Sequence, residues 1–429
     1  MKVLIVGSGG REHALAWKLK QSPMVGKIYV APGNAGINLI ANCINIKIDD
    51  IKELANFAER HHIDLTVVGP ELPLTIGVVD EFNRRNLKIF GPTRAAAELE
   101  GSKAFAKEFM RKHHIPTAPF QKFTQPTDAA SFVKTTVMPI VIKASGLAAG
   151  KGAVVVRSYE EANHVIEEMM VKKIFGEAGD TIVIENFLEG QELSVMAFCD
   201  GANIKMMLPS QDHKPIGEGD TGPNTGGMGA YCPATFVDEA TMALIRDHII
   251  DRAVLGMAKE GRLYKGVLYA GLMLTDNGPK VVEFNCRFGD PETQAVLPLL
   301  KSDLADIMIA VIEGHLNSID DLKWEEGAAS CVVLASKGYP QKAETGKRIF
   351  GLRNYSDRNC QLFHAGTRRN GKNWFTAGGR VIGVTSVDTD LKSSLAKAYD
   401  VINAIKFDGM YYRTDIGSRA NIPVKISRI

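Results

Sequence analysis

Short apolar runs alternate with helical patterns along the first hundred residues of the chain. Strands are predicted at residues 3–6, 27–30, 65–68 and 87–90, and a helix begins at about Glu12. Strands that alternate with helices in this way predict a parallel sheet whose faces are covered by helices. Gly91-Pro92-Thr93 ends the pattern, so we expect an N-terminal α/β domain over residues 1–101.

The rest of the chain predicts further units of mixed α+β type. A helix at 95–114 and a proline-rich connector at 115–119 precede strands from residue 139 and a helix at 159–170. The polar stretch 210–229 has little periodicity, which is typical of a long functional or mobile loop. Strands at 329–334 and 381–384 and a helix at 391–405 predict a small closing domain over 326–429. Residues 102–325 then form the central domain.

One apolar strand, at residues 281–286, carries two oxygen-bearing side chains. Because side chains alternate along a strand, Glu283 and Asn285 point to the same face. The opposite face receives Val282, Phe284 and Cys286. Carboxylate and amide oxygens suit Mg²⁺, which is usually held by one or two protein groups together with waters and substrate phosphates. A strand with a merely polar outer face is the alternative, but Arg287, Asp290 and Glu292 in the next turn favour the metal site.

Composition excludes several classes of function. The chain has 429 residues, 45% hydrophobic and 23% charged, with a formal net charge of +2. It has no polybasic tract, so neither nucleic-acid nor membrane-surface binding is indicated. The six cysteines are scattered without a CxxC pair, which predicts free thiols in a reducing compartment. No stretch approaches the apolar length that spans a bilayer, and we expect a cytoplasmic protein.

The glycine-rich turn at residues 7–13 follows the first strand and opens the first helix. Free backbone N–H groups at such a helix start favour an anion, which makes a phosphate site reasonable there. Glu12 stands where a dinucleotide fingerprint needs its third glycine, and the second strand ends without an acidic residue for the ribose. An NAD-dependent oxidoreductase is therefore a weaker alternative, and a tight turn without a ligand also stays open.

Three other segments carry charged groups that suit a nucleotide. The loop 145–152 follows Lys143 and contains Lys151 and several glycines, as a polyphosphate cradle or as a flexible hairpin, although it lacks the P-loop spacing. The strand 181–192 ends in carboxylates that suit a purine and ribose or simply solvent. In the polar stretch, Lys214 is a better anion ligand than His213. We find no Ser/His/Asp or Cys/His arrangement, which disfavours covalent nucleophilic catalysis.

Taken together, the segments 7–14, 31–36, 210–214, 222–229 and 287–294 (RFGDPETQ) resemble the phosphoribosylamine–glycine ligase family, in the family's order. The resemblance covers residue 1 to about residue 417. It implies an N-terminal preATP-grasp domain, two ATP-grasp subdomains with a lid at about 123–194, and a completing C-terminal domain. It also implies ligation of glycine to 5-phosphoribosylamine with ATP, through a glycyl phosphate, in de novo purine synthesis.

The resemblance assigns roles to individual positions. Glu283 and Asn285 match the family's ligands for Mg²⁺ or Mn²⁺. The ATP-binding positions are Lys103, Lys143, Gly146, Gly150, Lys151, Gly152, Glu185, Phe187, Leu188 and Glu192. Glycine and phosphoribosylamine would face Arg287, Asp290, Asp212 and Lys214. The sugar phosphate would meet Gly9, Gly10, Arg11 and Asn34.

The expected partners are these small molecules, with no nucleic acid and no membrane, and the chain is expected to be a monomer or a weak homodimer. Asn186 departs from the two acidic residues of many members, so we place no chemistry on it. A nucleotide-binding regulatory module without turnover is the second alternative. It would bind ATP but show no glycine-dependent hydrolysis.

Overall fold

The N-terminal strands form one parallel sheet in the computed structural model, which describes residues 1–148, 151–352 and 359–422. The strand order is β3-β2-β1-β4-β5, so the chain moves to the other side of β1 after β3, and the predicted sheet is confirmed. The strands are β1 (Lys2–Gly7), β2 (Lys27–Pro32), β3 (Asn42–Cys43), β4 (Leu65–Val68) and β5 (Ile89–Phe90). The helices here are α1 (Gly10–Leu19), η1 (Ile37–Leu39), α2 (Ile51–His61), α3 (Glu71–Thr75) and α4 (Val78–Arg84).

The single helix predicted at 95–114 is wrong, because two helices occupy this stretch. They are α5 (Arg94–Gly101) and α6 (Lys103–Lys112), and Ser102 between them is extended, with φ −138° and ψ 105°. The Ser102 hydroxyl accepts a hydrogen bond from Phe105 N–H at 3.2 Å, as an N-cap residue does. The break places Lys103 in the first turn of a new helix.

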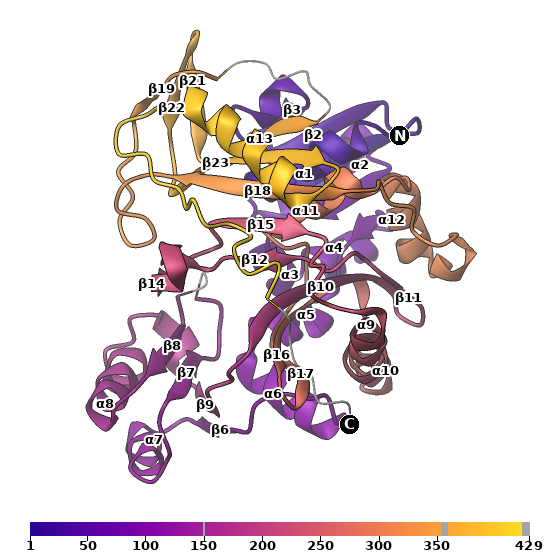
Figure 1. The fold of residues 1–429 in the computed structure, drawn as a ribbon. Coiled ribbons are helices and arrows are strands. Elements are labelled where there is room, and N and C mark those ends of the chain that lie inside the picture. Colours follow the sequence, from indigo (N-terminus) through magenta and orange to yellow (C-terminus); the bar gives the residue numbers. More distant parts are fainter. Residues whose placement is uncertain (149–150, 353–358, 423–429) are drawn as a thin grey trace.

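A small antiparallel sheet and its helices form a separate unit at the edge of the molecule, at the lower left of Figure 1. Its strand order is β6-β9-β7-β8. The strands are β6 (Phe120–Phe123), β7 (Ile140–Ala144), β8 (Ala153–Val156) and β9 (Ile182–Asn186). The helices are α7 (Pro126–Val133), α8 (Tyr159–Ile166), η2 (Glu167–Val171) and η3 (Gly176–Gly179). This unit buries its own apolar cluster between sheet and helices, and we call it the lid.

The central sheet has the strand order β11-β10-β16-β17 and carries the predicted metal strand at its edge. Its strands are β10 (Gln191–Asp200), β11 (Ile204–Met206), β16 (Lys265–Thr275) and β17 (Gly278–Asn285). Helices of this part of the chain are α9 (Glu239–Ile245), η5 (Arg246–Ile250), α10 (Asp251–Lys259), α11 (Glu292–Val296), η6 (Leu297–Leu299), α12 (Leu304–Glu313) and η7 (Leu316–Ser318).

The register of the central sheet sets which side chains share a face. Gly271 of β16 pairs with Ser194 of β10 and with Glu283 of β17. Tyr269 likewise lies opposite Asn285, and paired residues of antiparallel strands point to the same side. Phe284 and Cys286 are buried in the core on the other side, as predicted. Val282 is an exception, because a bulge between Glu283 and Val281 puts Val281 in the core and leaves Val282 half-buried beside the cleft.

A third sheet unites the middle of the chain with its C-terminal part, in the order β12-β15-β18-β23-β20. Its strands are β12 (Gln211–Asp212), β15 (Gly229–Cys232), β18 (Ala328–Ala335), β20 (Cys360–His364) and β23 (Arg380–Asp388), with helix α13 (Leu391–Ala404) packed on it. A smaller sheet is made of β19 (Arg348–Ile349), β21 (Thr367–Asn370) and β22 (Asn373–Thr376). In Figure 1 this region and the N-terminal sheet lie together at the top.

The polar stretch 210–229 is more regular than predicted. Besides β12, it contains a hairpin of β13 (Pro215–Gly217) and β14 (Thr221–Asn224), joined by η4 (Glu218–Asp220). The C-terminal segment 411–419, which we call the strap, holds this hairpin. Arg413, only 1% exposed, donates to Asp220 at 2.8 Å and to the Pro215 carbonyl at 3.1 Å. Because β13 and β14 are only three and four residues long and the side chain of Arg413 that holds them lies 193 positions away from Asp220, local periodicity does not reveal them.

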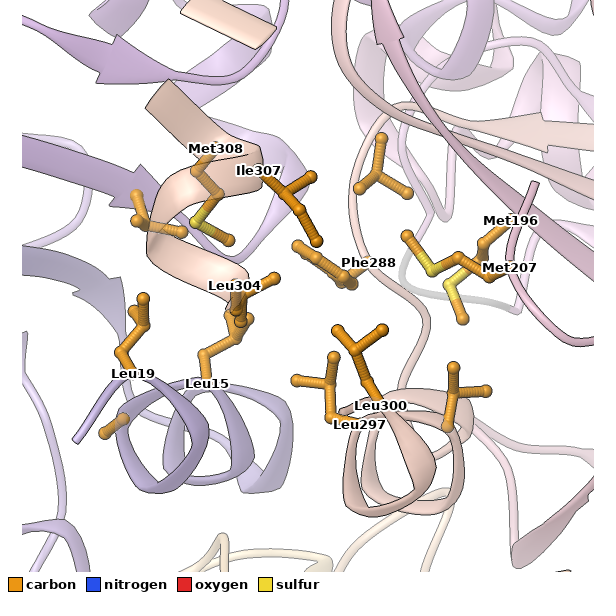
Figure 2. Close-up of a cluster of buried hydrophobic side chains, with 14 of the residues drawn as sticks. Leu15, Leu19, Met196, Met207, Phe288, Leu297, Leu300, Leu304, Ile307 and Met308 are labelled. Atoms are coloured by element: carbon orange, nitrogen blue, oxygen red, sulfur yellow. The ribbon is translucent and has the colours of Figure 1, made fainter. Parts of the chain in front are cut away.

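Phe288 lies at the centre of an apolar cluster that joins these parts (Figure 2). Leu15 and Leu19 of α1 approach it from one side, and Met196 and Met207 from the other. Leu304 and Ile307 of α12 complete the packing. The strand that carries Glu283 therefore continues into a turn anchored in the core. Among the helices of the described chain, none combines the length and the apolar character that a membrane span needs.

Candidate functional site

A cleft of about 660 Å³ lies between the lid, the central sheet, the N-terminal sheet with its helices and the third sheet. Twelve of the predicted site residues line it: Arg11, Lys103, Lys143, Lys151, Gly152, Glu192, Asp212, Lys214, Glu283, Asn285, Arg287 and Asp290. They come from positions spread over some 280 residues of sequence. The fold therefore brings together residues that the sequence related to one another only through the motifs in which they occur.

Glu283 is the carboxylate around which cations collect. Burial raises the pKa of Glu283, but nearby positive charges more than offset this effect, so its pKa lies below the ordinary value. These charges belong to Lys214, Lys143, Lys103 and Arg287. The side-chain oxygen of the neighbouring Asn285 accepts a hydrogen bond from Arg287 Nη2 at 3.2 Å. An excess of positive charge around one carboxylate suits a polyanionic ligand.

Two buried lysines share one carboxylate where the lid meets α6. Glu185 forms ion pairs with Lys143 of β7 and Lys107 of α6, and all three side chains are at most 5% exposed. Lys143 Nζ also donates to the Val282 carbonyl at 2.9 Å, and Lys107 Nζ donates to Thr117 at 2.7 Å. Burial lowers the pKa of Lys107 to about 8, although Glu185 opposes this shift. The network fixes Lys143 at the wall of the cleft.

Lys103 links the base of the cleft to the lid. Its Nζ donates to the Gly146 carbonyl at 3.2 Å, and the backbone N–H groups at the start of α6 donate to Ser145. Burial lowers the pKa of Lys103, while Glu283 raises it. Gly150 lies outside the described residues. Lys151 and Gly152 line the cleft, so the described part of the loop 145–152 contributes to the cleft wall.

A second group of polar side chains lies beside Glu283. Lys214 Nζ donates to Asp212 at 3.0 Å and to Glu192 at 2.9 Å. The Ser194 hydroxyl contacts Asp212 at 3.3 Å and Glu292 at 3.2 Å. The Tyr269 hydroxyl donates to the same Glu292 oxygen at 2.7 Å. This group holds more carboxylates than ammonium groups, in contrast to the surroundings of Glu283.

The turn after β17 is held from three directions. Arg287 pairs with Glu100 at 3.0 Å and with Glu71 at 3.4 Å. Burial raises the pKa of Glu100 to about 7, and the charge of Arg287 lowers it only in part. Asp290 pairs with Arg380 of β23 at 2.9 Å. Arg380 also donates to the Gly226 carbonyl at 2.6 Å, so the third sheet fixes both the turn and the segment 222–229.

The crevice above β1 and β4 is filled by the side chain of Glu12. One Glu12 oxygen accepts the Ser8 and Gly9 N–H groups, at 3.1 and 2.5 Å, and the other accepts Arg11 Nε at 2.6 Å. A Cβ at Gly7 or Gly69 would overlap with Glu12. The backbone N–H groups of Ser8 and Gly9, which would hold a phosphate at this helix start, therefore already donate to the Glu12 carboxylate. Arg11 and Glu12 are both at most 7% exposed.

Some predicted positions lie away from the cleft wall. Gly9 and Gly10 form the turn below Glu12, and Asn34 donates to the Ser8 and His364 carbonyls, both at 2.8 Å. Asn34 thus joins the N-terminal sheet to the third sheet. Four further predicted positions, Gly146, Glu185, Phe187 and Leu188, are not among the described residues that line the cleft.

Sequence reasoning missed several lining residues. Lys107 follows Lys103 by four positions, a helical spacing that could have revealed it. Tyr269 lies opposite Asn285, and it could be found only from the register in which β16 pairs with β17. Glu292 was seen in the turn but given no place in the site. Arg380 and Tyr339 come from the C-terminal part of the chain, where no local signal marked them.

Comparisons with known proteins extend this picture. Sequence models of the phosphoribosylglycinamide synthetase N domain, ATP-grasp (A) domain and C domain match residues 1–100, 101–293 and 329–419. A phosphoribosylamine–glycine ligase of Caldanaerobacter subterraneus is 50% identical over 418 residues, which cover 97% of this chain and 100% of that protein.

Solved structures agree. The crystal structure of a phosphoribosylamine–glycine ligase from Thermotoga maritima is similar with a TM-score of 0.83 and 34% identity, over 97% of this chain and 100% of that one. The biotin carboxylase domain of the Hydrogenobacter thermophilus 2-oxoglutarate carboxylase, solved with the magnesium salt of ADP, has a TM-score of 0.74 and 13% identity. It covers 96% of this chain and 92% of that one, and at this identity the likeness concerns the fold alone.

Proposed function

We propose how the cleft works from one premise: the chain belongs to the phosphoribosylglycinamide synthetase family and is a phosphoribosylamine–glycine ligase of the ATP-grasp fold. In the proposed reaction, the γ-phosphoryl group of ATP moves to the glycine carboxylate. The amine of 5-phosphoribosylamine then attacks the glycyl phosphate, and ADP, phosphate and glycinamide ribonucleotide are released.

The observation that carries this proposal is the cluster of four cations around Glu283 in the cleft. Phosphoryl transfer depends mainly on positioning and on neutralising charge, and needs no protein nucleophile. We assign Lys103, Lys143 and Lys151 to the ATP phosphates and Glu192 to the ribose. The hinge 185–188 would hold the adenine, with Glu185 acting mainly by fixing Lys143.

The residues present fit a divalent ion held jointly with ATP. Glu283 and Asn285 offer two oxygens on one face of β17. The described residues contain no cluster of three or more His, Cys, Asp or Glu side chains that could hold a metal alone, as expected for Mg²⁺, which completes its shell with phosphates and water. When bound, Mg²⁺ or Mn²⁺ would neutralise phosphate charge. The two side chains would hold it, and the hydrogen bond from Arg287 orients Asn285 for this role.

The remaining predicted positions divide between the other substrates. We assign Arg287, Asp290, Asp212 and Lys214 to the side of the cleft that receives glycine and the sugar amine. Arg11 is the strongest of the predicted sugar-phosphate ligands, since it lines the cleft, whereas the Gly9 amide already donates to Glu12. The domain division at residues 101 and 325 and the monomer or weak homodimer stay predictions.

Release of ADP tests the function. The purified protein with Mg²⁺, ATP, glycine and freshly generated phosphoribosylamine should release ADP and form glycinamide ribonucleotide. Reactions without glycine or without the sugar amine are the controls. Glycine-independent release alone would contradict the ligase, and ATP binding without turnover would favour the regulatory alternative. An NAD-dependent oxidoreductase is disfavoured because Glu12 fills the crevice that a dinucleotide would need.

A further inference from the structure

A buried group of two lysines and one glutamate lies where the lid meets α6. Glu185 of β9 forms an ion pair with Lys143 of β7 through one carboxylate oxygen and with Lys107 of α6 through the other. All three side chains are at most 5% exposed. We call this group the trio. Its two ammonium groups outnumber its one carboxylate, so the trio as a whole carries a positive charge.

The ammonium group of Lys107 is held from two sides. Besides its ion pair with Glu185, it donates to the Thr117 hydroxyl at 2.7 Å. This hydroxyl in turn donates to the Val281 carbonyl of β17 at 2.6 Å, which anchors Lys107 on the central sheet. Lys143 lies on the other side of Glu185 and lines the cleft. Lys107 therefore influences a ligand in the cleft through Glu185 and Lys143.

A carboxylate that is shared between two cations neutralises each of them only in part. We propose that Lys107 is a positioning residue for the nucleotide: by sharing Glu185, it leaves Lys143 with positive charge for the phosphate chain. Without Lys107, the other two side chains would form a closed ion pair, which attracts a polyphosphate much less. This inference rests on the proposed function, in which Lys143 binds the ATP phosphates, and it adds a residue that sets the strength of that binding.

Burial makes the charge of the trio sensitive to pH. It lowers the pKa of Lys107 to about 8, while Glu185 raises this pKa and Lys143 lowers it. Two further charged groups face the trio, Lys103 and Glu283, which are of opposite charge. As the pH rises through about 8, Lys107 loses its proton and the trio loses its positive charge. Polyphosphate binding should therefore weaken, and by reciprocity a bound polyphosphate should raise the pKa of Lys107.

Calorimetric titration of Lys107→Met with ADP and Mg²⁺ tests the charge, because methionine keeps most of the volume without the ammonium group. At about pH 7 the affinity for ADP should be about tenfold lower than in the wild type. The affinity for adenosine, which has no phosphate, should stay the same. Lys112→Met is the matched control, because Lys112 is an exposed lysine of the same helix, paired with Glu260 at 2.8 Å. An equal loss for ADP and adenosine would show a merely structural role and overturn the inference.

The double variant Lys107→Met/Glu185→Gln separates charge from packing. It leaves Lys143 as the single charge of the trio, so the affinity for ADP, relative to that for adenosine, should return to within about threefold of the wild type. If Lys107 only supported the fold, the second substitution would lower the affinity further. The double variant also carries the test if Lys107→Met alone does not fold, since it removes the carboxylate together with the ammonium group.

The pH profile is a readout that packing alone would not change. The difference between the wild type and Lys107→Met should narrow from about tenfold at about pH 7 to about twofold at about pH 9, where the free wild type has also lost this proton. A difference that stays constant with pH would overturn the inference. Wild-type protein that binds ADP but makes no glycinamide ribonucleotide would contradict the proposed function, whereas unchanged ADP affinities in an active enzyme would overturn this inference alone.

Discussion

Two places in the molecule combine glycines with a carboxylate, and they differ in what fills the space. Above β1 and β4, Gly7 and Gly69 make room for the side chain of Glu12, which saturates the local amides and pairs with Arg11. On the central sheet, Gly271 lies beside Glu283, but the space above it belongs to the cleft. The first place is closed by the chain itself, and the second is open to a ligand.

The difference shows that glycines leave space beside a sheet. The charges of the surrounding residues decide whether a side chain of the protein or a ligand fills that space. Ligands in open α/β sheets usually bind where the strand order reverses, which here is the crevice between β1 and β4. Glu12 already provides the anion at that point, and Arg11 balances it. Around Glu283, by contrast, Lys214, Lys143, Lys103 and Arg287 together lower the pKa of one carboxylate, and the cleft beside them leaves room for a ligand anion. Three substitutions test this comparison.

Glu12→Ala should have the largest effect, on stability. Removing one partner of a buried ion pair costs about 3–5 kcal/mol, and here the Ser8 and Gly9 amides also lose their acceptor. Urea denaturation should show this loss, whereas Glu53→Ala, at an exposed ion pair, should change little. Stability that survives the substitution and increases on adding inorganic phosphate would instead make the crevice an anion site.

Glu283→Gln should act on turnover rather than on folding. The substitution keeps the volume and one acceptor, but it weakens the placement of a metal ion, and we expect kcat to fall at least about a hundredfold, equivalent to about 2.7 kcal/mol. Steady-state ADP release and a urea curve would separate the two effects. Activity near that of the wild type would remove Glu283 from its proposed role and weaken the contrast with Glu12.

His13→Asn should have the smallest effect, which depends on pH. Burial lowers the pKa of His13 from 6.5 to about 3, so below pH 6.5 the unfolded chain takes up a proton that the folded chain refuses. Stability is therefore lost as the pH falls, by about 1.4 kcal/mol at pH 5.5 for this residue. Asparagine can still accept the His364 N–H that His13 accepts at 2.9 Å.

The free energy of unfolding of His13→Asn should accordingly fall less between pH 7.5 and pH 5.5 than that of the wild type. The exposed His62 ends α2 in a left-handed conformation, which asparagine also tolerates, so His62→Asn is the control. Equal pH dependence in the wild type and His13→Asn would show that burial in the folded protein does not prevent protonation of His13.

Much of the fold and part of the site followed from the sequence, because periodicity and charge are local. Alternation along 281–286 correctly placed Glu283 and Asn285 on one face. It did not predict the bulge that turns Val282 away from the core. The break at Ser102 was missed because Ser145 of the lid binds the start of α6, a tertiary contact. Arg380 was missed because its partner Asp290 lies ninety positions away.

The strap holds a hairpin that is synthesised long before the strap itself. The hairpin β13–β14 leads into Thr225 and Gly226 at the wall of the cleft, yet Arg413, Asp415 and Arg419 hold it in place. A growing polypeptide exposes this hairpin roughly two hundred residues before its clamp emerges from the ribosome. A polypeptide that has not yet reached the strap therefore carries Lys103, Lys143 and strand β17 of the cleft, but the wall at Thr225 and Gly226 lacks the contacts that hold it.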